Sequence, residues 1–328
     1  MPSTTTRRDV LKSLALASLA IGIASPSKAA LGKGKKALTQ GAGFYKKRIG
    51  AIELYVIADG SIPLDSNVFG SGKASREEIE AALAATYQPT DVVPTHVQTF
   101  VIKTGDQTIL VDTGLNGAWG PESGLLTQHL ANAGFRTEDI TDLVLTHAHP
   151  DHLFGALDKA GKPVFKKAAH HITQAELDQW YGLYEQIDSI EQEGFADMVR
   201  GIHQHLEAIK PKLNVIEPDA VIAPGVTGIP LPGHTQGHIG LKLESEGQQH
   251  WFLADFAHNH ELFLAHPDWG IDYDTDGEQA IATRQKRLAM AAEQGVEVSG
   301  SHMPFPAVGH IAKAGEGYRW VPELWRWS

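Results

Sequence analysis

The sequence predicts a mixed α/β protein of the α+β kind, folded as a four-layered αββα sandwich. Strands come first along the chain, then helices, then strands, one long helix and a last strand. Two similar halves of this kind, each a sheet with helices, would pack sheet against sheet. A hydrophobic fraction of 42% over 328 residues suffices for one large core, and no linker divides residues 49–328. A single domain over these residues is therefore expected.

Hydrophobic periodicity, helix caps and turn residues place the individual elements. Ser75 and Glu78 form the capping box of a predicted helix over 75–86. The other elements predicted in the first half are strands 51–58, 97–103, 107–112 and 142–146 and helices 123–134, 173–187 and 195–210. Those predicted in the second half are strands near 213–216, 226–231, 238–244, 249–254 and 296–300 and a helix over 277–294.

The N-terminal residues 1–29 are expected to be an export signal. Arg7 and Arg8 precede an apolar run over 14–24 and a small-residue cleavage site. The run is too short to cross a bilayer of ~30 Å as a helix, so no stable membrane anchor is expected. The arginine pair resembles a twin-arginine signal and indicates a periplasmic or secreted protein. Residues 30–48, rich in Gly, Lys and Ala, are predicted to form a flexible linker.

Charge and composition narrow the chemistry. The formal net charge is −11, and such an acidic surface repels phosphate backbones, so nucleic acid is not expected as a partner. The chain has no Cys, which excludes disulfides and thiolate metal sites. It has 17 His. A metal would have to be held by imidazole and carboxylate, which favours zinc, manganese, iron or cobalt.

The sequence HAHPDH after the predicted strand 142–146 is the strongest candidate for a metal site. Pro150 keeps His149 extended and suits the first position of a helix. His147 and His149 then point the same way, and Asp151 and His152 lie in the first helical turn. Four ligand-type side chains are therefore expected to converge from one loop.

Later segments supply further ligands. Gly233 allows a tight turn before His234, and Asp255 ends an apolar strand, where a buried carboxylate needs a partner. His302 follows the last predicted strand in the same way. His238 could equally support a ligand or be structural.

This order of residues closely resembles the metallo-β-lactamase superfamily, whose signature is H-x-H-x-D-H followed by a distant His, Asp and His. The resemblance implies that type of αββα fold and two divalent metal ions. One ion would be bound by His147, His149 and His234, the other by Asp151, His152 and His302, with Asp255 bridging both. Asp112, in the early Asp-Thr-Gly element, would orient a ligand imidazole.

The resemblance also implies hydrolysis. Flavodiiron oxygen reductases of the superfamily carry an acidic residue where this chain has His149, so zinc and redox-inert chemistry are favoured. Zinc lowers the pKa of water to about 7, and a bridging hydroxide would attack the substrate. Asp255 and Asp151 are the expected catalytic carboxylates, and Asp151 could relay a proton to the leaving group.

Within the superfamily the likeness is to methyl parathion hydrolase and its lactonase and aryl esterase relatives. It covers nearly all of residues 41–322 and is most specific over 302–306, 309–311 and 317–319. It implies a pocket with Trp119, Trp180 and Phe195 as walls and His258, Ile271 and Tyr273 near the metals. The polar members favour a lactone or an aryl or alkyl ester as substrate, with phosphotriester hydrolysis as the alternative.

Charge and composition also bear on other classes of function. Nucleic-acid phosphodiester cleavage is disfavoured by the acidic charge, and glutathione thioester hydrolysis by the lack of a basic patch. A non-enzymatic periplasmic metal-binding protein is the alternative outside the enzymes. By family likeness, Trp320, Trp325 and Trp327 could dock a second subunit in a homodimer.

Overall fold

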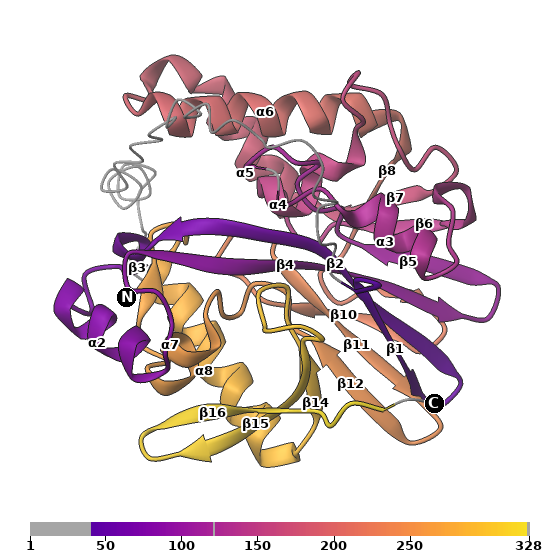
Figure 1. The fold of residues 1–328 in the computed structure, drawn as a ribbon. Helices are drawn as coiled ribbons and strands as arrows, with labels where there is room; N and C mark the ends of the chain where they lie inside the picture. Colours follow the sequence, from indigo (N-terminus) through magenta and orange to yellow (C-terminus); the bar gives the residue numbers. More distant parts are fainter. Residues whose placement is uncertain (1–40, 121, 327–328) are drawn as a thin grey trace, which may run out of the picture.

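The computed structural model describes residues 41–120 and 122–326 (Figure 1). Two seven-stranded sheets lie face to face, with α4, α5 and α6 over the first and α7 and α8 beside the second. The predicted αββα sandwich is therefore confirmed. The predicted signal over 1–29 lies outside the described residues, as does the linker predicted from residue 30 up to residue 40.

The first sheet has the order β1-β2-β4-β5-β6-β7-β8, antiparallel up to β5 and parallel from β5 to β8. Its strands are β1 (Phe44–Ile49), β2 (Ile52–Asp65), β4 (Val92–Thr104), β5 (Gln107–Val111), β6 (Asp142–Val144), β7 (Ala169–Thr173) and β8 (Leu213–Ile216). Its helices are α3 (Leu126–Asn132), α4 (Pro150–Leu153), α5 (Gln174–Glu185) and α6 (Glu193–Ile209). An apolar cluster that includes Leu143, Phe165 and Ile202 joins these helices to the sheet.

The second sheet has the order β16-β15-β14-β12-β11-β10-β9 and is antiparallel except for the β12–β14 pair. Its strands are β9 (Val221–Ala223), β10 (Val226–Pro230), β11 (Ile239–Ser245), β12 (Gln248–Phe252), β14 (Glu297–Ser299), β15 (Val308–Ala314) and β16 (Gly317–Pro322). The helices of this half are α7 (His260–Ala265) and α8 (Gly277–Gln294). Phe100 and Phe252 meet between the sheets, with ring centroids 4.4 Å apart, in the central core.

A helix and a pair of short strands lie at one end of the sandwich. Ser75 is the N-cap of the helix α2 (Arg76–Ala85), and the predicted capping box with Glu78 is present. The short strands β3 (Phe69–Gly70) and β13 (Gly270–Ile271) pair with each other. Among the described residues, no helix combines the length and the apolar character that crossing a bilayer requires.

The predicted linker was wrong over its last residues, because 44–48 belong to β1. Tyr45 and Ile49 are buried, and the Nζ of Lys47 lies 2.5 Å from Glu297 and 3.2 Å from Glu323. Three consecutive basic residues suggested solvation, but the alternation of the strand leaves Lys47 half-buried, in ion pairs with two glutamates. The C-terminal strands β15 and β16 were not predicted either.

The topology gathers loops at one edge of the sandwich. Strands β5, β6, β12 and β14 end just before Asp112, His147, Asp255 and His302, respectively, and the β10–β11 loop carries His234. Because β5 and β6 are parallel, as are β12 and β14, the loops that follow each pair emerge on the same side.

Candidate metal centre

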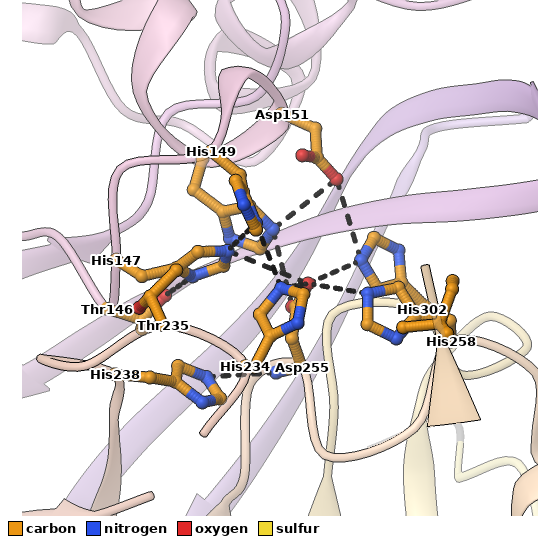
Figure 2. A network of polar contacts seen from close by, with 12 residues as sticks. Thr146, His147, His149, Asp151, His234, Thr235, His238, Asp255, His258 and His302 are labelled. Carbon is orange, nitrogen blue, oxygen red and sulfur yellow. Dashed lines mark hydrogen bonds and ion pairs between the residues drawn. The ribbon is translucent and has the colours of Figure 1, made fainter. Parts of the chain in front are cut away.

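The loop after β6 has the geometry that its proline predicts. His149 is extended, with φ −60° and ψ 155°, and is the N-cap of α4, which begins at Pro150. Asp151 and His152 lie in that short helix, and both side chains are buried. His147 is completely buried beneath them. His147, His149 and Asp151 point toward one another (Figure 2), and the Nε2 of His152 lies 3.3 Å from Asp151 Oδ2.

Three imidazoles form the first ligand group. The Nδ1 of His149 lies 3.0 Å from the Nε2 of His147 and 2.9 Å from the Nε2 of His234. These three nitrogens come from two loops that are far apart in the sequence. The structure therefore brings together the three histidines predicted to share one metal.

The second group combines two carboxylates and two imidazoles. The Nε2 of His302 lies 2.9 Å from Asp255 Oδ2 and 3.5 Å from Asp151 Oδ2. The Nε2 of His152 lies 3.3 Å from an oxygen of each carboxylate. Asp255 Oδ2 also lies 3.4 Å from the Nε2 of His234, so this carboxylate stands between the two groups. That is the position expected of a bridging ligand.

Hydrogen bonds on the far side of the rings assign the tautomers. The Nδ1–H groups of His152, His234 and His302 donate to Asp112 Oδ2, Asp274 Oδ1 and the backbone oxygen of His96, respectively, over 2.7–2.8 Å. Each neutral ring then turns an unprotonated Nε2 toward the cluster. Because such a nitrogen lone pair repels a facing carboxylate oxygen, either a proton or a metal cation must lie between the two atoms.

The hydrogen bonds of Thr146 assign the tautomer of His147. Its hydroxyl donates to Asp112 Oδ2 at 2.8 Å, so its oxygen accepts from the Nδ1–H of His147 at 3.1 Å. The Nε2 of His147 is thereby also an unprotonated nitrogen that faces the cluster. The donor set fits two divalent cations with N and O ligands.

Two buried atoms in the cluster support this fit. His152 Nε2 and Asp255 Oδ1 have no hydrogen-bond partner, although they lie 3.3 Å apart. Burial lowers the pKa of His234, but the hydrogen bonds to Asp255 and Asp274 outweigh burial and raise it to about 9. Without metal, protons compensate the buried carboxylates, so metal binding displaces protons.

Three polar residues hold the ligands in place. Asp112 accepts hydrogen bonds from the Thr146 amide and from His152, both at 2.8 Å, as its predicted orienting role requires. His238 accepts from the Asp255 amide at 3.3 Å and donates to the Leu231 carbonyl at 3.0 Å, so it supports the ligand Asp255. Asp274 was missed, because no strand end or glycine turn marks it in the sequence.

An apolar cavity of about 240 Å³ adjoins the cluster. It is lined by Trp119, Trp180, Phe195 and Tyr273 from the predicted pocket set, together with Phe154, Leu183 and Met198. Trp119, His149, Met198 and Tyr273 also line a second cavity of about 40 Å³ that contains Asp151, His234, Asp255 and His302. The cavity walls therefore reach the candidate ligands.

The other two predicted pocket residues lie differently. His258 lines the smaller cavity, its Nε2 lies 3.2 Å from Asp255 Oδ2, and its ring stacks on His302 at 4.9 Å. Ile271 lines neither of these two cavities. Its side chain is buried in the central core, where β13 pairs it with Phe69.

Comparison with known proteins agrees with this geometry. The family model of the metallo-beta-lactamase superfamily matches residues 92–302. The chain is 30% identical to AidC, a dizinc quorum-quenching lactonase solved with N-hexanoyl-L-homoserine, with a TM-score of 0.80, covering 87% of this chain and 98% of AidC. The hydrolase AbOPH is 27% identical, with a TM-score of 0.80, over 88% of this chain and all of that one.

A curated N-acyl homoserine lactonase from Bacillus sp is 23% identical over 74% of this chain and 92% of its own length. The fold, the ligand cluster and the family match define the class of protein. The chain belongs to the metallo-beta-lactamase superfamily and, within it, to the metal-dependent hydrolases.

Proposed function

We propose that this protein is a dinuclear metal-dependent lactonase that opens lactone rings bearing an apolar acyl chain, as in N-acyl homoserine lactones. One observation carries the proposal: a seven-residue ligand cluster opens directly into a cavity with aromatic and aliphatic walls. The relatives AidC and the Bacillus lactonase support the same substrate class.

In this proposal, one metal ion would be held by His147, His149 and His234 and the other by Asp151, His152 and His302, with Asp255 available to both. Zinc is favoured by the donor set and by the dizinc relative, with manganese, cobalt or iron as alternatives. Bound zinc supplies Lewis acidity and lowers the pKa of water to about 7.

The chain's own residues bind and orient the substrate. Trp180, Phe195 and Leu183 bury the acyl chain, at about 0.8 kcal/mol for each methylene removed from water. Burial raises the pKa of Tyr273 to about 12, so its hydroxyl stays protonated and can donate to a lactone oxygen. Asp151, which lines the inner cavity, is placed to carry a proton to the leaving oxygen.

The experiment that tests the proposal compares kcat/KM of the zinc-loaded protein for homoserine lactones from butanoyl to dodecanoyl, an aryl ester and methyl parathion. We expect the lactones to be preferred and KM to fall with chain length. A much higher kcat/KM for methyl parathion would replace lactone by phosphotriester hydrolysis. Absence of turnover on every substrate would favour the non-enzymatic metal-binding alternative.

We also propose that the protein is exported folded through a twin-arginine signal. The support is the pair Arg7 and Arg8 ahead of the apolar run over 14–24. Replacing both arginines by lysine should retain the protein in the cytoplasm, and normal export of that variant would contradict the proposal. The proposed homodimer is tested by sedimentation of the purified mature chain.

A further inference from the structure

The side chain of Glu176 is completely buried and accepts four hydrogen bonds. Its Oε1 accepts from the Ala148 amide at 2.9 Å and from the indole Nε1–H of Trp180 at 2.6 Å. Its Oε2 accepts from the Thr235 hydroxyl at 2.5 Å and from the Gly237 amide at 3.2 Å. Each carboxylate oxygen therefore binds a different part of the site.

These contacts lead directly to the ligand cluster. Ala148 lies between His147 and His149, and Thr235 follows His234. One carboxylate thus joins the two loops that supply the three-histidine group. The ends of the two loops are also joined by the backbone, because the Ile239 amide donates to the Thr146 carbonyl at 3.0 Å.

Trp180 extends the connection to the cavity. Its indole lines the apolar cavity, and its ring centroid lies 5.4 Å from that of His149, edge to face. The hydrogen bond to Glu176 fixes the plane of this large ring. The same carboxylate therefore orients one wall of the cavity and holds the two loops that carry the three histidines.

We propose that Glu176 is a positioning residue that holds the three-histidine metal group and the cavity wall in one fixed arrangement. The reading of the cavity as an acyl subsite rests on the proposed function. The effect on the three-histidine group does not, because it depends only on the hydrogen bonds to the two loops.

The chemistry of the four donors explains why a carboxylate stands here. All four partners donate, and an ionised carboxylate offers only acceptors. A glutamine amide must turn its NH₂ toward one pair, where at least one backbone or indole N–H meets it. Burial raises the pKa of Glu176, whereas the hydrogen bonds from Thr235, Trp180 and Ala148 act in the opposite direction and favour the ionised carboxylate.

Helix capping does not account for this side chain. Thr173 is the N-cap of α5, and its hydroxyl accepts from the Glu176 amide and donates to the Gly237 carbonyl. The carboxylate of Glu176 makes no bond to the helix terminus and is directed to the loops instead. The N-terminal turn of α5 therefore contacts the loop over 234–238 through two side chains, those of Thr173 and Glu176.

The test is a stepwise Co²⁺ titration of the metal-free Glu176→Gln variant, followed by the cobalt d–d absorption and by competition with a chelator. We expect one of the two binding steps to weaken about 10–100-fold while the other stays close to wild type. For the active enzyme we expect KM to rise more for the dodecanoyl than for the butanoyl lactone.

The matched control is Asp59→Asn. Asp59 is another buried carboxylate that accepts backbone hydrogen bonds, from Leu115, Gly124 and Leu126, and none of these three partners is a candidate ligand. This variant should lose stability but keep both cobalt steps. Equal weakening of both steps in Glu176→Gln, or no change in either, would overturn the proposal.

Two milder variants decide the matter if Glu176→Gln does not fold. Thr235→Val removes one donor at similar volume and should weaken the same cobalt step to a smaller extent. Trp180→Phe keeps a ring in the cavity but loses the indole donor, and should change KM while leaving cobalt binding intact. An unaffected step in Thr235→Val contradicts the proposal. If wild-type protein hydrolyses no lactone, the proposed function fails, and the cobalt titration still tests Glu176.

Discussion

At the scale of single residues, the candidate ligands are held by partners that the ligand motif does not contain. Asp112 has a left-handed backbone conformation, with φ +62°, which is uncommon for a residue with a side chain. In this conformation its carboxylate accepts from the Thr146 amide, the Thr146 hydroxyl and His152. Such strain persists where surrounding hydrogen bonds enforce it, and it is frequent at functional sites.

We therefore predict that Asp112→Ala lowers zinc affinity about 10–100-fold, because His152 loses the acceptor that fixes its ring. Chelator competition measures the change. Asp139→Ala is the control, since Asp139 is an exposed carboxylate that pairs with Arg136 away from the cluster. Unchanged zinc affinity in Asp112→Ala would show that the ring is held by its metal alone.

His250, a buried histidine away from the cluster, leads to a prediction about the pH dependence of stability. His250 is buried in β12, where Glu297 and Ser299 bond to its two ring nitrogens at 2.8 and 2.9 Å. Burial lowers the pKa of His250. Burial raises the pKa of Glu297, but the hydrogen bonds from His250 and Lys47 outweigh it and lower that pKa to about 2.

A lowered histidine pKa means that the unfolded chain takes up the proton first as the pH falls below 6.5. The contribution of the neutral, buried His250 to the free energy of unfolding is complete above pH 6.5 and is lost as the pH falls below that value. We predict that the unfolding free energy of His250→Gln falls less steeply than that of the wild type from pH 6.5 to about 5, measured by urea denaturation of the zinc-loaded protein. His310→Gln, at an exposed position, should keep the wild-type slope; equal slopes in all three proteins would exclude this role of His250.

At the scale of elements, α5 packs against the loop over 234–238. This packing holds that loop beside the loop that carries His147 and His149. A Cβ atom at Gly237 would lie 2.2 Å from Thr173 Oγ1 and 2.3 Å from the Glu176 amide nitrogen. Only glycine permits this approach. This glycine therefore lets α5 pack closely against the loop that carries His234.

Gly237→Ala should accordingly reduce the free energy of unfolding by about 1–3 kcal/mol and weaken metal binding, because the helix and the loop must separate. The control is Gly182→Ala in α5, where an added Cβ atom would have no neighbour within 4 Å. That substitution should stabilise the protein by about 0.5–1 kcal/mol. Equal stability of the two variants would contradict this account of the loop.

Element prediction succeeded where local signals are strong and failed where packing decides. The capping box at Ser75 and the proline-defined start of α4 were both predicted and found. The strand β1 was missed, because the burial of Lys47 depends on Glu297 and Glu323, which are distant in sequence. Glu176 and Asp274 were missed for the same reason, since their partners are set by tertiary structure. Ile271 was assigned to the pocket by likeness, and the pairing of β13 with β3 places it in the core.

At the scale of the whole molecule, the candidate ligands come from both halves of the sandwich. The first sheet's loop supplies His147, His149, Asp151 and His152, and the second sheet's loops supply His234, Asp255 and His302. Metal ions bound there would join the two halves at the edge where the apolar cavity opens. The two ligand groups and the adjoining cavity thus form a single unit that neither half contains alone.

The most direct test of this unit is to titrate the metal-free chain with zinc while following the proton released when N-hexanoyl homoserine lactone opens. Our account predicts that the rate rises to a plateau at two zinc ions per chain. A plateau at one zinc ion, or no hydrolysis at two, would contradict the dinuclear lactonase.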